Sequence, residues 1–188
     1  MSGKHHFTGR AWKFGDYIRG DSGIIDFALI RDHSKPFNAQ ELAANCFKNI
    51  RSEFAEQVKK GDIVVAGKGF ANYNHPQVSL AIKASGIRCV LCESCEPSLV
   101  RKALNVGLPV LPVPGITGIV ADGESLEVDL EKGSIHNPKT GARLSASVLP
   151  ARMLGIIEHG GVIEYLAYQK MIHGSLTRLD IGRPKAAE

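Results

Sequence analysis

The chain has 188 residues, 44% of them hydrophobic, which suffices for one well-buried core but not for two large domains. Its net charge of +4 comes from 23 basic and 19 acidic residues spread along the chain. We therefore expect no nucleic-acid partner, and an anionic small molecule fits this charge at least as well. No apolar run is long enough to span a membrane and no signal peptide is visible, so we expect a cytoplasmic protein without a membrane partner.

The first third of the chain combines strand-like and turn-like segments. Residues 7–16 favour a strand, and the glycines at 20 and 23 mark a turn before the apolar segment 24–30. Asn38 is a suitable N-cap for a helix that begins at Ala39.

Residues 61–107 organise the rest of the molecule. They read as strand, glycine-bearing loop, helix, strand and helix, expected at 62–66, 67–75, 76–86, 89–92 and 97–106. Pro76 suits the first helical position, where no backbone donor is needed. A loop that leads into a helix N-terminus attracts anions, because free N–H groups and the positive end of the helix dipole point into it. We therefore expect a carboxylate or phosphate site around residues 72–75.

The last third predicts an extended segment at 109–113, a β-hairpin region at 126–136 and two short helices at 150–159 and 161–171. The β-α-β-α-β order of the middle, with mostly β flanks, predicts a single α/β domain over residues 1–188, with a central, mostly parallel sheet flanked by helices. We expect residues 1–6 and 174–188 to be loosely ordered tails. Ligands in such domains lie at the carboxyl ends of strands, where the loop after Ala66 stands.

Three cysteines, Cys89, Cys92 and Cys95, have the C-x-x-C-x-x-C spacing of iron–sulfur ligands. Residues 88–92, however, favour a buried strand, in which positions three apart point to opposite faces. Cys46, the only other cysteine, lies far away in the sequence. We therefore predict small buried cysteines in a reducing compartment and no metal site in this chain.

Several segments, taken in order, carry a resemblance to a known family. Asp21 with Ile24 and Ile25 is similar to an N-T-D-x-I-I pattern. The other matching segments are 9–16, 61–70, 81–87, 105–110, 127–133 and 160–166. Their order and spacing resemble the small subunit of 3-isopropylmalate dehydratase, a family of leucine biosynthesis that is equivalent to the mobile swivel domain of aconitase.

The resemblance implies a swivel-type α/β fold and a lyase that is active only with a partner. A separate large subunit would carry a 4Fe-4S cluster, and this chain, which holds no cofactor itself, would close over it in a heterodimer. The substrate would be a 2-hydroxy di- or tricarboxylate that is dehydrated or isomerised. In the family a G-S-S-R-E loop supplies a serine as the base and an arginine that grips a carboxylate.

This chain departs from the family at that loop. Residues 71–76 read ANYNHP, with no serine, threonine or arginine, so the bidentate arginine clamp is lost. In one interpretation Tyr73 or His75 replaces the serine as the catalytic base, while Asn72 and Asn74 bind the substrate carboxylate with the helix N-terminus. In another, the asparagines merely cap the helix and fill the turn.

Arg31 follows a segment that resembles the family's specificity loop, and it is our candidate for the missing carboxylate contact. Arg19, beside Asp21 in a turn, is a second candidate. The changed loop leaves two further alternatives open. One is a dehydratase for a different substrate, such as a methylated malate, and the other is a non-catalytic binding or regulatory module that keeps the fold.

Overall fold

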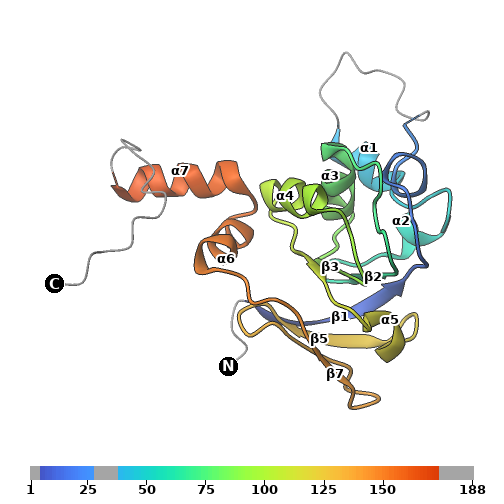
Figure 1. The fold of residues 1–188 in the computed structure, drawn as a ribbon. Helices are drawn as coiled ribbons and strands as arrows, with labels where there is room; N and C mark the ends of the chain where they lie inside the picture. Colours follow the sequence, from blue (N-terminus) through green and yellow to red (C-terminus); the bar gives the residue numbers. More distant parts are fainter. Residues whose placement is uncertain (1–4, 28–37, 174–188) are drawn as a thin grey trace.

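The computed structural model describes residues 5–27 and 38–173. Its strands form one sheet of seven, in the order β4-β3-β2-β1-β5-β6-β7. Figure 1 shows helices above the parallel strands and the strands β5 and β7 below them. The strands are β1 (His6–Lys13), β2 (Ile63–Ala66), β3 (Cys89–Cys92), β4 (Val110–Pro112), β5 (Ser125–Asp129), β6 (Ser134–His136) and β7 (Arg143–Ser145).

Seven α-helices and one π-helix complete the described fold. They are the π-helix η1 (Gly20–Ile24) and the helices α1 (Ala39–Ala44), α2 (Phe54–Gln57), α3 (Pro76–Ala84), α4 (Pro97–Asn105), α5 (Ile116–Ile119), α6 (Ala151–Glu158) and α7 (Val162–His173). Proline opens both α3 and α4, as expected where no backbone donor is required. The side chain of Asn38 accepts a hydrogen bond from the Gln40 N–H, which confirms the predicted N-cap of α1.

Strand β1 joins two different halves of the sheet. On one side it pairs in parallel with β2, which continues in parallel to β3 and β4. On the other side it pairs antiparallel with β5, followed by β6 and β7. The predicted α/β sheet is thereby confirmed, and the predicted hairpin region proves to be continuous with it.

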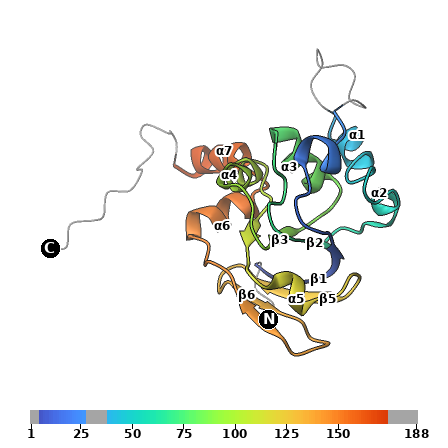
Figure 2. The ribbon, with the colours of Figure 1, turned by 45° about the vertical axis from the view of Figure 1, so that its right-hand side comes forward.

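Two hydrophobic clusters lie on opposite faces of the parallel strands. Trp12, Val64 and Val90 pack under α1 to α4, whereas Ala11, Val65 and Leu91 face α5 and the antiparallel strands. This alternation follows from the period of two in a strand, and burial on both faces explains why β2 and β3 read as continuous apolar runs. Figure 2 shows the two layers, with α1 to α4 above the parallel strands and α5, β5 and β6 below them.

At the N-terminus, ordered structure begins earlier than the sequence predicted. The structure starts β1 at His6. His5 is only 8% exposed, and its carbonyl accepts a hydrogen bond from the Leu130 N–H. Both residues belong to the range expected to form a loose tail. Residues 1–4 and 174–188, like the candidate Arg31, lie outside the described residues.

Helices α6 and α7 follow the last strand and pack against α4. They correspond to the two helices predicted at the C-terminal end, and Figure 1 shows α7 reaching away from the sheet. Within the described residues, no helix combines the length and the apolar character that crossing a bilayer requires.

Candidate functional site

The loops that follow β1, β2 and β3 meet at one edge of the sheet. The Lys68 N–H donates to the Asp16 carboxylate at 2.7 Å, and the Tyr17 N–H donates to the Lys68 carbonyl at 2.7 Å. From the loop after β3, the Ser94 hydroxyl and carbonyl accept the N–H groups of residues 69 and 70, both at 3.0 Å. Hydrogen bonds to backbone and side-chain atoms of two neighbouring loops therefore fix the backbone of the loop at 67–75, at the edge where α/β domains bind ligands.

Three non-glycine residues at this edge have left-handed backbone conformations. These are Tyr17, Ala71 and Tyr73, with φ angles of 54°, 56° and 56°. Such conformations cost about 1–2 kcal/mol for each side chain and persist only where the surroundings enforce them. Ala71 is fully buried, but the two tyrosine side chains are 66% and 64% exposed. An unfavourable backbone conformation therefore holds each of the two tyrosine rings at the surface of this edge.

Tyr73, a predicted catalytic residue, is stacked on an arginine. The guanidinium carbon of Arg19 lies 4.1 Å from the centre of the Tyr73 ring. The same guanidinium donates to both carboxylate oxygens of Asp21, from Nε at 2.9 Å and from Nη2 at 2.7 Å. The hydrogen bonds from Arg19 lower the pKa of the Asp21 carboxyl, against the opposing effect of its burial. Tyr73, Arg19 and Asp21 thus form one cluster of contacting side chains at the surface of this edge.

The side chain of Asn74 points from the loop towards α4. It is 7% exposed, and its amide nitrogen donates to the Glu96 carboxylate at 3.2 Å and to the Ser98 hydroxyl at 3.1 Å. The Lys102 ammonium donates to its side-chain oxygen at 2.9 Å. The N-cap of α3 is His75, so the interpretation that Asn74 caps this helix is wrong. Its side chain ties the loop to α4 instead.

His75, the other predicted catalytic residue, stands at the exposed entrance of α3. Its side chain makes no capping hydrogen bond, and its ring meets the ring of Phe27 edge-on, with 4.9 Å between the centres. The first turn of α3 contains no acidic residue. No acidic side chain in that turn therefore offsets the positive end of the helix, and the anion site expected around residues 72–75 stays a prediction.

Asn72 is half-buried between these residues, and its carbonyl accepts the Gly20 N–H at 2.7 Å. The structure therefore brings together Asn72, Tyr73 and His75 as neighbours on one loop. The sequence analysis missed Tyr17 and Phe27, which stand beside them. An aromatic residue directly after the Gly15-Asp16 turn is the one sequence signal for Tyr17, and Phe27 belongs to the segment before Arg31 that resembles the family's specificity loop.

Cys46, Cys89 and Cys92 are buried, as predicted, whereas Cys95 is partly exposed. Cys89 belongs to the cluster that faces α5 and Cys92 to the cluster under α3, so their sulfur atoms lie on opposite faces of the sheet. Burial raises the pKa of the Cys89 thiol to about 12, which disfavours the thiolate that a metal requires. Among the described residues no group of three His, Cys, Asp or Glu side chains has the geometry of a metal site.

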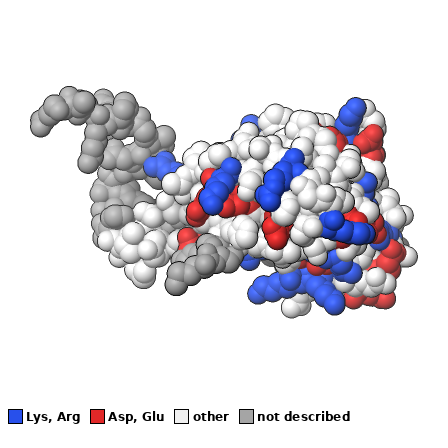
Figure 3. Space-filling view, turned by 90° about the horizontal axis from the view of Figure 1, so that it is seen from below, with Lys and Arg blue, Asp and Glu red and all other residues white. Residues whose placement is uncertain are grey.

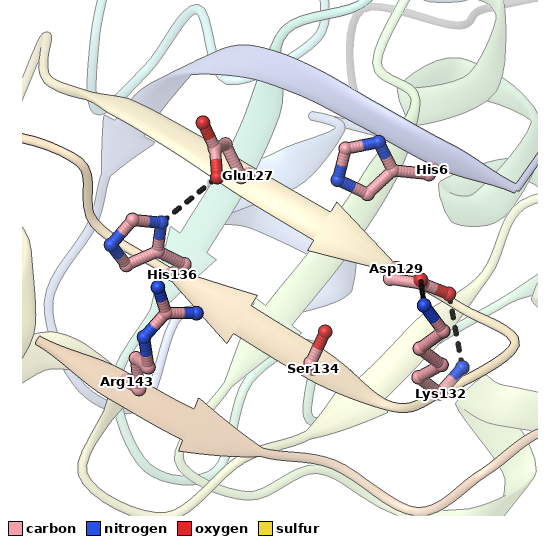
Figure 4. A pocket seen from close by; sticks show the side chains of 7 residues that line it. All are labelled: His6, Glu127, Asp129, Lys132, Ser134, His136 and Arg143. Atoms are coloured by element: carbon pink, nitrogen blue, oxygen red, sulfur yellow. Dashed lines mark hydrogen bonds and ion pairs between the residues drawn. The ribbon is translucent and has the colours of Figure 1, made fainter. Parts of the chain in front are cut away.

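Two cavities in the described structure lie away from this edge. One, of about 340 Å³, lies on the outer face of the antiparallel strands, where Figure 4 shows His136 bonded to Glu127 and Lys132 bonded to Asp129. Seen from below, acidic and basic side chains alternate over the molecule rather than forming a field of one sign (Figure 3). The carboxylates of Glu127 and Asp129 offset the charge of the basic side chains that line this cavity, so it offers an anionic ligand less than the loop edge does.

The second cavity, of about 1050 Å³, lies at the opposite edge, where β2, β3 and β4 begin. Lys60, Lys83 and Arg88 line it. Burial lowers the pKa of the Lys83 ammonium, and repulsion from Arg88 and Lys60 adds to the effect. The Lys83 ammonium donates to the Gly107 carbonyl at 2.9 Å, which gives it a structural role.

No family model matches the sequence, but individual proteins of known function do. The chain is 42% identical over 158 residues to 3-isopropylmalate dehydratase small subunit 1 of Archaeoglobus fulgidus, covering 84% of this chain and 94% of that protein. It is 39% identical over 159 residues to the isopropylmalate/citramalate isomerase small subunit of Methanocaldococcus jannaschii, covering 84% of this chain and 92% of that protein.

A solved structure supports the same relationship. The crystal structure of a 3-isopropylmalate dehydratase from Methanocaldococcus jannaschii superimposes with a TM-score of 0.78 at 32% identity, covering 90% of this chain and 98% of that one. The swivel-type fold that the sequence predicted is thereby confirmed. The chain belongs to the family of 3-isopropylmalate dehydratase small subunits.

Proposed function

We propose that this chain works with a cluster-bearing large subunit to dehydrate or isomerise a 2-hydroxy di- or tricarboxylate. The observation that carries the proposal is the loop at 67–75. It stands at the edge where the family places its catalytic loop, and it presents Tyr73 and His75 to the outside while its backbone is pinned from two sides. Such a loop suits a subunit that closes over a reaction centre on a partner, and we place this heterodimer in the cytoplasm.

In this proposal the side chains of the loop move protons and hold carboxylates. When the large subunit is bound, its 4Fe-4S cluster supplies Lewis-acid activation of the substrate hydroxyl. Tyr73 or His75 takes the proton from the carbon next to the carboxylate and returns it in the reverse direction. Both side chains reach solvent and are free of capping duties, which suits proton transfer.

The carboxylate-binding role falls to the backbone and polar groups around the loop. Asn72 and the first turn of α3 offer hydrogen-bond donors at the positive end of a helix. Asn74, whose side chain is bonded to α4, positions the loop. Arg31 remains our candidate for a substrate contact from the segment that resembles the specificity loop.

For the substrate we propose a branched or methylated malate. One relative's name includes isopropylmalate and citramalate, two malates that differ in the size and place of their alkyl group. Tyr73 stands where the family loop has a small serine, so the walls of the site differ in shape. A substrate other than 3-isopropylmalate is consistent with that change.

The test is reconstitution with the large subunit from the same organism, followed by dehydratase assays with 3-isopropylmalate and citramalate. We expect a brown complex that is active on at least one of them. Tyr73→Phe and His75→Ala should identify the base, with a loss of kcat of about 100- to 10,000-fold for whichever residue transfers the proton. Arg101→Gln, an exposed change on α4, is the matched control.

The absence of the serine and arginine from the loop favours a second candidate, a non-catalytic binding module. A colourless chain that recruits no large subunit would support this second candidate. So would a complex whose activity survives both substitutions.

A further inference from the structure

We infer that Arg19 binds a substrate carboxylate in place of the family's loop arginine, which this chain lacks. This inference deepens the proposed function and rests on it. It concerns a substrate-binding residue that comes from the loop after β1 rather than from the loop after β2.

The backbone of Arg19 is tied to the candidate loop. Arg19 and Asn72 form an isolated parallel bridge, and the Gly20 N–H donates to the Asn72 carbonyl at 2.7 Å. On its other side, the Arg19 carbonyl accepts the N–H groups of Gly23 and Ile24 at 3.1 and 3.0 Å. The position of Arg19 is therefore set by the same hydrogen bonds that set the loop.

The segment after Arg19 is one residue longer than the family pattern. The N-T-D-x-I-I pattern has one residue between its aspartate and its first isoleucine, whereas here Ser22 and Gly23 separate Asp21 from Ile24. The structure accommodates the additional residue in the π-helix η1, which begins directly after Arg19.

The guanidinium of Arg19 is oriented but not used up. Its Nε and one Nη2 hydrogen bind Asp21, and the face of the group lies on the Tyr73 ring, 4.1 Å from its centre. The opposite edge of the planar group carries one N–H on Nη1 and one on Nη2, and Asp21 binds neither of these two donors. That edge has the fork geometry that binds a carboxylate with two hydrogen bonds.

Exposure and charge agree with this role. The Arg19 side chain is 49% exposed, next to Tyr73 at the surface that a partner would cover. An exposed ion pair such as Arg19–Asp21 contributes little to stability in water. Its value here is orientation, because a preorganised guanidinium loses less freedom when a substrate binds.

The test uses the reconstituted complex with 3-isopropylmalate and with citramalate as the assayed substrates. Arg19→Gln should raise KM about tenfold to hundredfold, the loss expected for a charged hydrogen bond, with a smaller change in kcat. Arg19→Lys should recover only part of the affinity, because an ammonium lacks the planar fork. Tyr73→Leu should raise KM by removing the ring that holds the guanidinium, and Arg101→Gln should leave KM unchanged.

A binding measurement makes the inference independent of turnover. In the complex labelled with 15N at the arginine Nε atoms, titration with 3-isopropylmalate or citramalate should shift the Arg19 resonance and leave that of Arg101 in place. A KM for Arg19→Gln within about twofold of the wild-type value, in an active complex, would overturn the inference and leave the proposed function standing. If the complex is inactive but either anion still shifts the Arg19 resonance, the proposed function falls and anion binding by Arg19 stands. If the complex is inactive and neither anion shifts that resonance, both the inference and the proposed function fall.

Discussion

The ammonium of Lys102 lies 2.9 Å from the side-chain oxygen of Asn74 and 2.8 Å from its carbonyl oxygen. One side chain of α4 thus binds both the backbone and the side chain of the candidate loop, in a partly buried place. Helix α4, which follows β3, therefore helps to hold the loop in position. The geometry of the loop is thus coupled to α4 as well as to α3.

Lys102→Met removes this connection and keeps an unbranched side chain that is only one atom shorter. We expect it to lower the free energy of unfolding by about 1–3 kcal/mol, because the Asn74 oxygens lose their charged donor. Urea unfolding of Lys102→Met, of Asn74→Ala and of the double variant measures the coupling. If the two single losses simply add, the hydrogen bonds do not act as the structure indicates.

Tyr73→Gly tests whether the loop stores backbone strain. Glycine adopts a φ of 56° without penalty, so we expect the free energy of unfolding to stay level or to rise by about 1 kcal/mol. Activity of the complex should fall at the same time, because the phenol and its contact with Arg19 are lost. Tyr73→Phe, which keeps the strain, should leave stability unchanged, and a clear destabilisation by glycine would contradict the prediction.

Asp62 makes part of the stability dependent on pH. Its carboxylate is 7% exposed; burial opposes its charge, but hydrogen bonds from the Lys59 N–H, Trp12 and Arg10 outweigh burial and lower its pKa. A lowered folded-state pKa means that the stabilisation is complete above the unfolded value of about 4 and is lost as the pH falls below it.

We therefore expect Asp62→Asn to cost about 2 kcal/mol at pH 7, since hydrogen bonds to a charged group are replaced by weaker ones. The difference between the wild type and the variant should shrink as the pH falls through the folded-state pKa. Urea unfolding of both proteins at neutral and acidic pH measures it. A difference that stays constant with pH would show that the charge of Asp62 does not contribute.

The four cysteines should differ in reactivity towards a thiol reagent. Cys46, Cys89 and Cys92 are buried, whereas Cys95 is partly exposed and a hydrogen bond from the Cys92 thiol lowers its pKa. We expect the folded chain to be labelled first at Cys95, as peptide mass spectrometry can determine. Cys95→Ser should remove the fast phase, and rapid labelling of Cys89 in the folded chain would contradict the buried strand.

Much of the fold could be predicted because its signals are local. Apolar runs placed β2 and β3, and prolines at helix starts placed α3 and α4. The cysteine spacing could be judged because the period of a strand is fixed. The pairing of β1 with β5 could not be predicted, since it joins residues more than a hundred positions apart and no short-range pattern encodes it.

The candidate site was predictable as a place but not as an arrangement. Glycines and a helix start located the loop, and the family resemblance explained why it matters. The stacking of Arg19 on Tyr73 and the partners of Asn74 depend on contacts between separate loops. The left-handed conformation of Tyr73 is imposed by the surrounding hydrogen bonds, against the preference of the residue itself.

The central place of β1 has a consequence for how the protein is made. Strand β1 leaves the ribosome before its two partners, β2 about fifty residues later and β5 about one hundred and twenty residues later. Until β5 has been synthesised, one edge of β1 lacks a hydrogen-bonding partner. The apolar residues that face α5 and the antiparallel strands are also exposed to water, as expected for a fold dominated by distant contacts. We expect the nascent chain to stay vulnerable to aggregation until residue 129 has emerged, and a chain cut short before β5 to be insoluble.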